Sequence, residues 1–207
     1  YNNADNSGVL RYVVVAESGY EFAPGNEINA ISLVGVGSGT TVDFVQVHGG
    51  SDDGIEMYGG TVNMKHLVLT NNLDDTIDWD EGYQGNIQYA IVRQGTTADG
   101  NVVEADTDGD TLSPMRAKPT LANFTFLANS ADDIALNLKA RTGGFFHNGI
   151  ITLLPGSAGT SCLEVTGSST QANRNQSLVL DNVIVNCGTF GDDTLSQATV
   201  FAVDPAL

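Results

Sequence analysis

Paired aspartates recur along the chain at a spacing that could let them bind a cation together. Asp52-Asp53 and Asp74-Asp75 lie 22 residues apart, and the third residue after each pair is also acidic. If successive repeats stack, such carboxylates converge, and Ca²⁺ takes six to eight oxygen ligands. The pattern predicts a divalent-cation site with Ca²⁺ as its ion. The candidate metal ligands are Asp52, Asp53, Glu56, Asp74, Asp75, Asp78, Asp80, Glu104, Asp106, Asp108 and Asp110.

Other interpretations of these acids stay open. Asp also caps backbone N–H groups at turns, so stacked corners can repeat Asp for that reason alone. The run from Asp106 to Asp110 places oxygens at alternate positions of a loop, as Ca²⁺ loops do. However, Lys118 and its neighbours stand where an EF-hand has its final glutamate. A solvated acidic loop explains that run as well as a metal site does.

The acids lie in a stretch, residues 42–81, whose pattern is repeated. Residues 45–47 correspond to 67–69, and residues 54–57 correspond to 76–79, in the same order and at the same offset. A period in the low twenties is typical of a solenoid. Each unit is a β-branched run, a Gly/Asp/Asn corner and a second short alternating run. We therefore predict an all-β fold, a single-stranded parallel β-helix of about seven coils.

Alternation within the second strand of each coil predicts which side chains point inward. The predicted inward residues are Ile55, Met57, Ile77, Trp79, Val103, Ala105, Ile134, Leu136, Leu163 and Val165. The predicted outward residues between them are Glu56, Asp78, Glu104, Ala135 and Glu164. Three successive acids at the ~4.8 Å spacing of strands repel one another unless they are protonated, hydrated or bridged by a cation.

The amino-acid composition limits the classes of molecule that the protein can bind. The 207 residues include 8 Lys+Arg and 25 Asp+Glu, which gives a formal net charge of -17. Like charge repels phosphate, so this balance disfavours nucleic acid and anionic membranes and favours divalent cations. No apolar run approaches the ~20 residues of a membrane span.

The chain is predicted to be one β-helix domain, residues 1–207, and a fragment or processed form of a longer chain. It starts abruptly at Tyr1, without a basic and then apolar signal peptide. Cys162 and Cys187 lie 25 residues apart, about one coil. They can form a disulfide between neighbouring coils or remain buried thiols, and their spacing does not decide between the two.

The coil pattern, with DDGI at 52–55 and DDTI at 74–77, resembles the right-handed parallel β-helix superfamily of pectate lyases, polygalacturonases and phage tailspikes, the pectin-lyase-like proteins. Three longer stretches resemble acidic bacterial β-helix proteins that are secreted or at the cell surface, often lipoproteins. These stretches are GNEINAISLVGVGSGTTVDFVQVHGGSDDGIEMYGGTVNMKHLVL, DDTIDWDEGYQGNIQYAIV and PTLANFTF. The resemblance implies a right-handed coil and an extracellular or outer-membrane-associated location. It implies no activity.

Sugars are the second class of partner to consider. Tyr58 and Tyr83 fall near corners, where their rings could stack on a polysaccharide or a cell-surface glycan. If the chain were a Ca²⁺-dependent lyase, Arg93 would be the best candidate for the base, with His48 on the same stack and Asp74 and Asp75 beside it.

A hydrolase of the polygalacturonase type fits less well. Its Gly-His-Gly is incomplete here, because His48 has no preceding Gly, and its Arg-x-Lys is reversed, at Lys139 and Arg141. The favoured function is a non-catalytic, Ca²⁺-binding extracellular or cell-surface module with a structural, adhesive or glycan-binding role. The alternative is a Ca²⁺-dependent polysaccharide lyase or glycoside hydrolase of the pectin-lyase-like superfamily.

Overall fold

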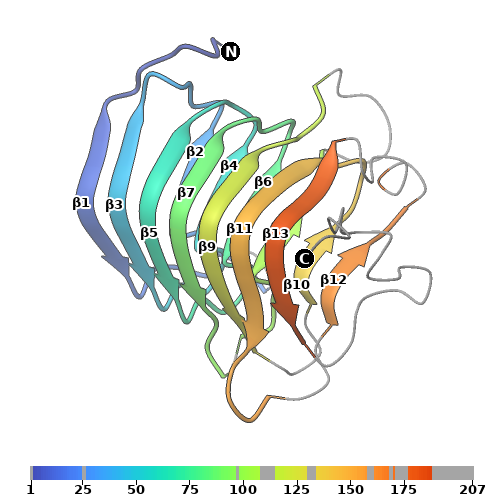
Figure 1. Ribbon diagram of the computed structural model, residues 1–207. Helices are drawn as coiled ribbons and strands as arrows, with labels where there is room; N and C mark the ends of the chain where they lie inside the picture. The colour runs from blue at the N-terminus through green and yellow to red at the C-terminus, as the bar shows by residue number, and fades with distance from the viewer. Residues whose placement is uncertain are drawn as a thin grey trace.

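The computed structural model describes residues 2–24, 27–96, 98–107, 115–129, 134–157, 161–167, 170 and 177–187. Within this part of the chain, strands form two parallel sheets (Figure 1). The seven-stranded sheet contains, in spatial order, β1 (Val9–Ala16), β3 (Thr41–His48), β5 (Asn63–Thr70), β7 (Asn86–Arg93), β9 (Thr120–Ala128), β11 (Gly144–Leu153) and β13 (Leu178–Asn186). The six-stranded sheet contains β2 (Ile31–Val34), β4 (Ile55–Tyr58), β6 (Ile77–Asp80), β8 (Val103–Ala105), β10 (Ile134–Leu138) and β12 (Ser161–Val165).

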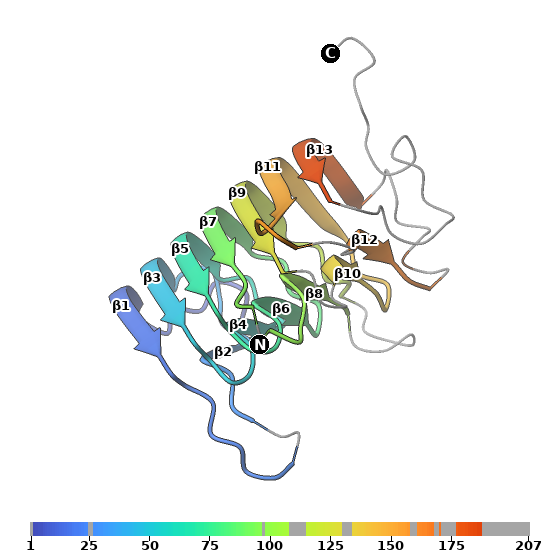
Figure 2. The ribbon, with the colours of Figure 1, turned by 90° about the horizontal axis from the view of Figure 1, so that it is seen from below.

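The chain crosses from one sheet to the other with each strand, so every coil adds one strand to each sheet (Figure 2). Residues one repeat apart in the sequence are paired in the sheets: Val45 pairs with Leu67, and Met57 pairs with Trp79. This topology confirms the predicted parallel β-helix. Among the described residues, no helix has the length and apolar character needed to cross a membrane.

Each strand of the seven-stranded sheet bends at one residue with a positive φ angle. We call these in-register residues the bend row: Tyr12, Phe44, His66, Tyr89, Asn123, Asn148 and Asn182. Asn adopts left-handed geometry readily, but aromatic residues do so rarely. Here the four rings stack on one another, with centroids 4.9, 4.3 and 5.0 Å apart along the row. The bend makes the sheet curve around the core (Figure 1).

Alternate side chains fill the inside of the coil as one apolar cluster. Trp79 is fully buried there, as predicted, and its indole N–H donates to Thr142 Oγ1 at 3.0 Å. Burial of such a large side chain would leave an unsatisfied donor without this bond. The core therefore explains the single tryptophan without any role in sugar binding.

The predicted register is wrong in one coil. Leu136 pairs with Val103 and Leu138 with Ala105, so Asn137 takes the outward position between them. Ala135, predicted to lie outward beside Glu104, precedes the residues that pair with β8 and is fully buried. A shift of two residues preserves the alternation of inward and outward side chains, so polarity along the strand does not reveal it.

Cys162 and Cys187 form a disulfide, with their Cα atoms 5.6 Å apart. Cys162 lies in β12, and Cys187 follows the end of β13. The bond therefore ties the two sheets together at the last described coil. Of the two alternatives that the spacing allowed, the structure has the disulfide.

Candidate functional site

The corners that precede β4, β6 and β8 stack closely because glycines leave room between them. The N–H of Gly54 donates to the carbonyl of Asp75 at 2.9 Å, and the N–H of Thr76 donates to the carbonyl of Asn101 at 3.0 Å. A Cβ at Gly54 would overlap the Asn72 side chain, and one at Gly100 would overlap Asp74. The sequence therefore brings the aspartates of successive coils side by side.

These corners and the outward residues of the six-stranded sheet line a groove of about 660 Å³, which we call the acidic groove. Its acidic lining residues are Glu27, Asp52, Asp53, Glu56, Asp74, Asp75, Asp78 and Glu104. Phe22, Ile28, Asn29, Ser32 and Tyr58 complete it. No Lys, Arg or His is among the lining residues in the described part of the chain.

Seven of these carboxylates form three overlapping groups. Within each group, one oxygen from every carboxylate lies within 4.8 Å of the others. The groups are Asp52, Asp53 and Asp74; Asp53, Glu56 and Asp78; and Asp75, Asp78 and Glu104. Since Asp53 and Asp78 each belong to two groups, the carboxylates form one continuous series across three coils.

Burial and mutual repulsion hold protons on this series. Burial, followed by the charge of Asp75, raises the pKa of Asp53 from its ordinary value of 3.8 to about 9. Burial and Asp53 raise the pKa of Asp78 to about 10, and burial and Glu104 raise the pKa of Asp75 to about 7. Two like unit charges 4 Å apart repel by about 4 kcal/mol at an effective dielectric of 20. Burial and repulsion therefore favour the protonated form of these carboxyl groups.

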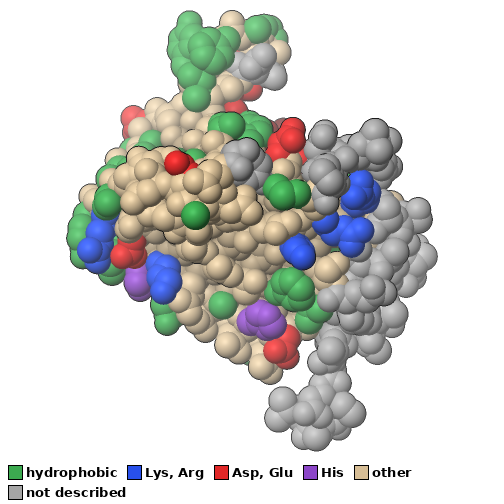
Figure 3. All heavy atoms as spheres, turned by 90° about the horizontal axis from the view of Figure 1, so that it is seen from above, with side chains coloured by type: hydrophobic (Ala, Val, Ile, Leu, Met, Phe, Trp, Pro, Cys, Tyr) green, Lys and Arg blue, Asp and Glu red, His purple; other side chains and the backbone are tan. Residues whose placement is uncertain are grey.

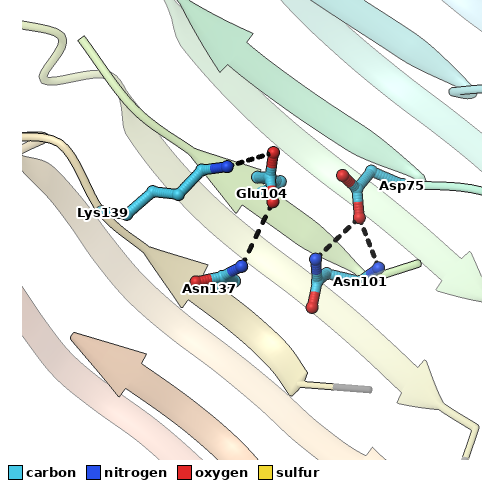
Figure 4. A network of polar contacts seen from close by, with 5 residues as sticks. All are labelled: Asp75, Asn101, Glu104, Asn137 and Lys139. Atoms are coloured by element: carbon cyan, nitrogen blue, oxygen red, sulfur yellow. Dashed lines mark hydrogen bonds and ion pairs between the residues drawn. The ribbon is translucent and has the colours of Figure 1, made fainter. Parts of the chain in front are cut away.

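Hydrogen bonds fix the carboxylates at the margins of the series (Figure 4). Asp75 Oδ1 accepts from both the backbone and the side-chain N–H groups of Asn101. Glu104 accepts from Asn137 Nδ2 at 3.2 Å and pairs with Lys139 Nζ at 2.7 Å. These contacts leave the middle of the series, Asp53 and Asp78, as its most proton-binding part.

A second set of bonds closes the other end of the groove. Glu56 Oε2 accepts from the Tyr58 hydroxyl and from Asn29 Nδ2. Burial, and then these two bonds in opposition to it, leave the pKa of Glu56 raised. Tyr58 thus lines the groove as a hydrogen-bond donor to a carboxylate.

The structure gathers most, but not all, of the predicted metal ligands. Asp52, Asp53, Glu56, Asp74, Asp75, Asp78 and Glu104 line the acidic groove. Asp80 pairs with Tyr58 in register and is outside the three groups, and Asp106, after β8, is outside the lining. Asp108 and Asp110 lie outside the described residues.

Four residues that line the acidic groove or bind its carboxylates were not predicted as site residues from the sequence. They are Glu27, Asn29, Asn101 and Lys139. Glu27 and Asn29 belong to a turn-rich excursion between the first two strands, where no repeat marks them. Asn101 follows Gly100 at the third corner, which lacks an aspartate pair. Lys139 follows β10, and its contact with Glu104 depends on the two-residue shift of that strand.

Tyr83 is not a surface for sugars, contrary to the prediction. Its ring is fully buried, and its hydroxyl donates to the carbonyl of Val62 at 2.9 Å. The turn after β6 passes through Gly82, whose φ angle is +80°, and directs the ring into the end of the coil. A buried ring has no face to offer a ligand.

The four residues proposed for catalysis do not share the groove. His48, Thr70 and Arg93 form one row of the seven-stranded sheet, as predicted. His48 Nδ1 lies 2.8 Å from Thr70 Oγ1, and Arg93 donates to Asn71. Within the described lining of the acidic groove, Asp74 is present and His48 and Arg93 are absent.

Comparison with known proteins agrees with the architecture. No curated protein and no solved structure matches the chain. A family model, described as a pectate-lyase-like β-helix domain, matches residues 1–200. Because the match covers nearly the whole length, the chain belongs to the pectate-lyase-like β-helix domain family, within the pectin-lyase-like proteins.

Proposed function

We propose that the acidic groove binds divalent cations, Ca²⁺ first among them. The observation that carries the proposal is the continuous series of seven carboxylates in three overlapping groups. A cation placed in the series would replace like-charge repulsion by attraction to several oxygens at once. Each group draws on two neighbouring coils, so one ion would link these coils.

The chemistry of the donors supports Ca²⁺ over softer metals. The three groups offer carboxylate oxygens only, whereas copper and zinc favour thiolate and imidazole ligands. Ca²⁺ accepts many oxygens in flexible geometry, which suits a groove of adjustable side chains. Extracellular Ca²⁺ modules work with Kd values of ~10⁻⁴–10⁻³ M, a range that does not require a rigid cage.

In this proposal the chain is a non-catalytic module that works outside the cell or at its surface, in a structural, adhesive or glycan-binding role. A solenoid owes its stability to contacts between neighbouring coils. Cations that join coils in the acidic groove would stiffen the rod where extracellular Ca²⁺ is available. Location and cation are both parts of the proposal.

The alternative is a Ca²⁺-dependent polysaccharide lyase or hydrolase. A lyase needs a neutral base near the metal, and among the described residues Lys139 is a cation that contacts the lining of the groove, through Glu104. Burial lowers the pKa of Lys139, but the hydrogen bond and charge of Glu104 outweigh burial and raise it. A lysine that holds its proton is a poor base, which favours the non-catalytic module.

The test is calorimetric titration and thermal unfolding with Ca²⁺, Mg²⁺ or EDTA. The variant is Asp74→Asn/Asp78→Asn, and the matched control is Glu164→Gln, on the same outward row but outside the three groups. Saturating Ca²⁺ at 100 times Kd stabilises by about 2.7 kcal/mol, or roughly 5–10 °C for a chain of this size. We expect this rise in wild type and in Glu164→Gln and its loss in the double variant. Equal response of all three proteins, or none in wild type, contradicts the proposal.

A further inference from the structure

The most exposed apolar side chains of the described residues are concentrated at one end of the solenoid. The first coil consists of β1, β2 and the excursion between them, which projects from the stack (Figure 2). Seven large apolar side chains are 64–73% exposed, and six of them belong to this coil. Hydrophobic side chains gather on the projecting part of the surface in Figure 3. The six are Val9, Tyr12, Val14, Tyr20, Phe22 and Val34.

The core is open at this same end. Leu10 and Val15 of β1 pack on the core but are only partly buried, whereas their partners in β3, Val42 and Val47, are 3% and 0% exposed. Among the described strands, β1 and β2 each pair with another strand on one side only (Figure 1). Their outer edges therefore carry backbone groups that a further strand can bind.

Residues 2–8 are held at a different place. The carbonyls of Asn3 and Asp5 accept from the N–H groups of Ser38 and Gly39 at 2.8 and 2.9 Å, in the turn before β3. We call the outer side of β1 and β2, with their exposed apolar side chains, the apolar end.

The apolar end lacks the features that usually keep edge strands apart. Edge strands are protected by charged residues, proline or bulges. β1 and β2 contain no proline and one charged residue, Arg11. Arg11 Nε lies 3.3 Å from Asp43 Oδ2 in the next coil, which offsets its charge. Two strands of this kind can therefore approach each other although the chain has a net charge of -17.

The shape of β1 suits a second copy of the same strand. Its bend residue, Tyr12, is the fourth of its eight residues, so an antiparallel copy bends at the same place. A two-fold axis between Tyr12 and Val13 would place Leu10 of one copy opposite Val15 of the other. Both residues pair in register with buried residues of β3, so they face the core. Opposite residues of an antiparallel pair lie on the same face, and core therefore meets core.

We propose that the chain forms a two-fold dimer in which the two apolar ends stack, with β1 antiparallel to β1 of the second copy. The contact continues the coil-on-coil interface that β1 already forms with β3 on its other side. An interface that pairs one surface with itself is closed by its symmetry, so it produces a dimer and no fibre. The dimer is a rod of twice the length with one acidic groove on each half.

The first test is sedimentation equilibrium in EDTA, which removes any contribution from bound cations. Wild type should form a species of about twice the 21.7 kDa of one chain. In the proposed register Val14 lies opposite Arg11 of the second copy. Val14→Lys therefore sets like charges opposite each other and should raise the dimer Kd roughly tenfold or more. Val14→Glu should raise the Kd less, because it attracts Arg11.

Ile91→Lys is the matched control. Ile91 belongs to the same outward row as Val14 and is 51% exposed, but its strand, β7, has a partner on each side. Its replacement should leave the dimer Kd unchanged. Unchanged circular dichroism spectra of all variants ensure that a change in mass reflects the interface.

The second test is cross-linking of Val9→Cys/Ala16→Cys. The two-fold axis places Val9 opposite Ala16 of the second copy. Within one chain the two positions are separated by the length of β1, roughly 23 Å, which no disulfide spans. Both side chains are exposed, so the exchange leaves the core intact. Oxidation should give covalent dimers of the double variant and of neither single variant.

Three results overturn the proposal. The first is a chain that stays at 21.7 kDa up to ~100 μM, a concentration at which a dimer with micromolar Kd is almost complete. The second is an equal effect of Ile91→Lys and Val14→Lys on the dimer. The third is a double cysteine variant that cross-links no more than the single variants. Species larger than a dimer also contradict it, since they require stacking through another surface.

Discussion

Replacing Asp78 by Asn should make the cation-free protein more stable at alkaline pH. Asp78 has its pKa raised to about 10 in the folded chain, against an ordinary value of 3.8. Between pH 5 and pH 8 the folded state therefore binds a proton that the unfolded state has released. Stability consequently falls as pH rises through this range. The amide of Asn stays neutral at every pH and removes the contribution of Asp78, whereas Asp53 and Asp75 keep theirs.

The magnitude follows from the number of pH units. For a carboxyl group that is protonated only in the folded state, each rise of one pH unit lowers the free energy of unfolding by about 1.4 kcal/mol. From pH 5 to pH 8 the loss is about 4 kcal/mol. Asp78 is half-buried at the edge of a groove that is open to water, and its neighbours share the protons. We therefore expect about 2–4 kcal/mol, or roughly 5–15 °C in the unfolding midpoint.

The assay is thermal unfolding in EDTA at pH 5, 6, 7 and 8 for wild type, Asp78→Asn and Glu164→Gln. The midpoint of wild type and of Glu164→Gln should fall with pH, and that of Asp78→Asn should fall less, because only the contribution of Asp78 is lost. Added Ca²⁺ at pH 8 should reverse the order, because the ionised carboxylates of wild type then gain a partner. Parallel curves for wild type and Asp78→Asn in EDTA would refute the reasoning, since the carboxyl would then titrate alike in both states.

Three further outcomes are expected. Ca²⁺ binding at pH 7 should release protons from the acidic groove, so that the observed enthalpy changes with the ionisation enthalpy of the buffer; a buffer-independent enthalpy argues against protonated aspartates. Cys162→Ser/Cys187→Ser should lose about 3 kcal/mol in chemical denaturation, because the bond closes a 25-residue loop; the loss should match that of the reduced wild type. Gly149→Ala should destabilise by ~1–3 kcal/mol, since its Cβ would overlap the ring of Phe124; a neutral result would mean that this ring moves freely.

The fold was predictable because the repeat encodes it directly. Residues one period apart pair in the sheets, so the 22-residue offset between Val45 and Leu67 is the register itself. The alternation of inward and outward side chains along each strand then identified core residues, including Trp79, and the outward position of Asp78. Local pattern and global pairing agree wherever coils have equal length.

The errors arose where coils differ in length or where a turn redirects a side chain. The alternation of side chains from Ile134 onward placed Ala135 opposite Glu104, whereas strand pairing places Asn137 there. Tyr83 follows a polar corner that looked exposed, yet the turn at Gly82 buries its ring. Neither the shifted register nor the buried ring changes the hydrophobic pattern of the sequence, so neither could be predicted from that pattern.

The candidate site was predictable in part for a similar reason. The aspartates of stacked corners must lie close together in any β-helix, and this places Asp53 and Asp75 in one groove. The excursion that contributes Asn29, and the contact of Lys139 with Glu104, depend on irregular segments. Such contacts do not recur with the period of the coils, so the repeat in the sequence does not predict them.

The bend row bears on how such a chain can lengthen. Each ring of the bend row stacks on its counterpart in the next coil, and the row changes from rings to amides between Tyr89 and Asn123. A tandem copy of residues 63–85 would insert next to a ring on either side and keep the stack unbroken. Duplication is therefore tolerated most easily among the first four coils. The stacked rings of the bend row therefore mark the part of the solenoid where additional coils can be inserted, in evolution or by design.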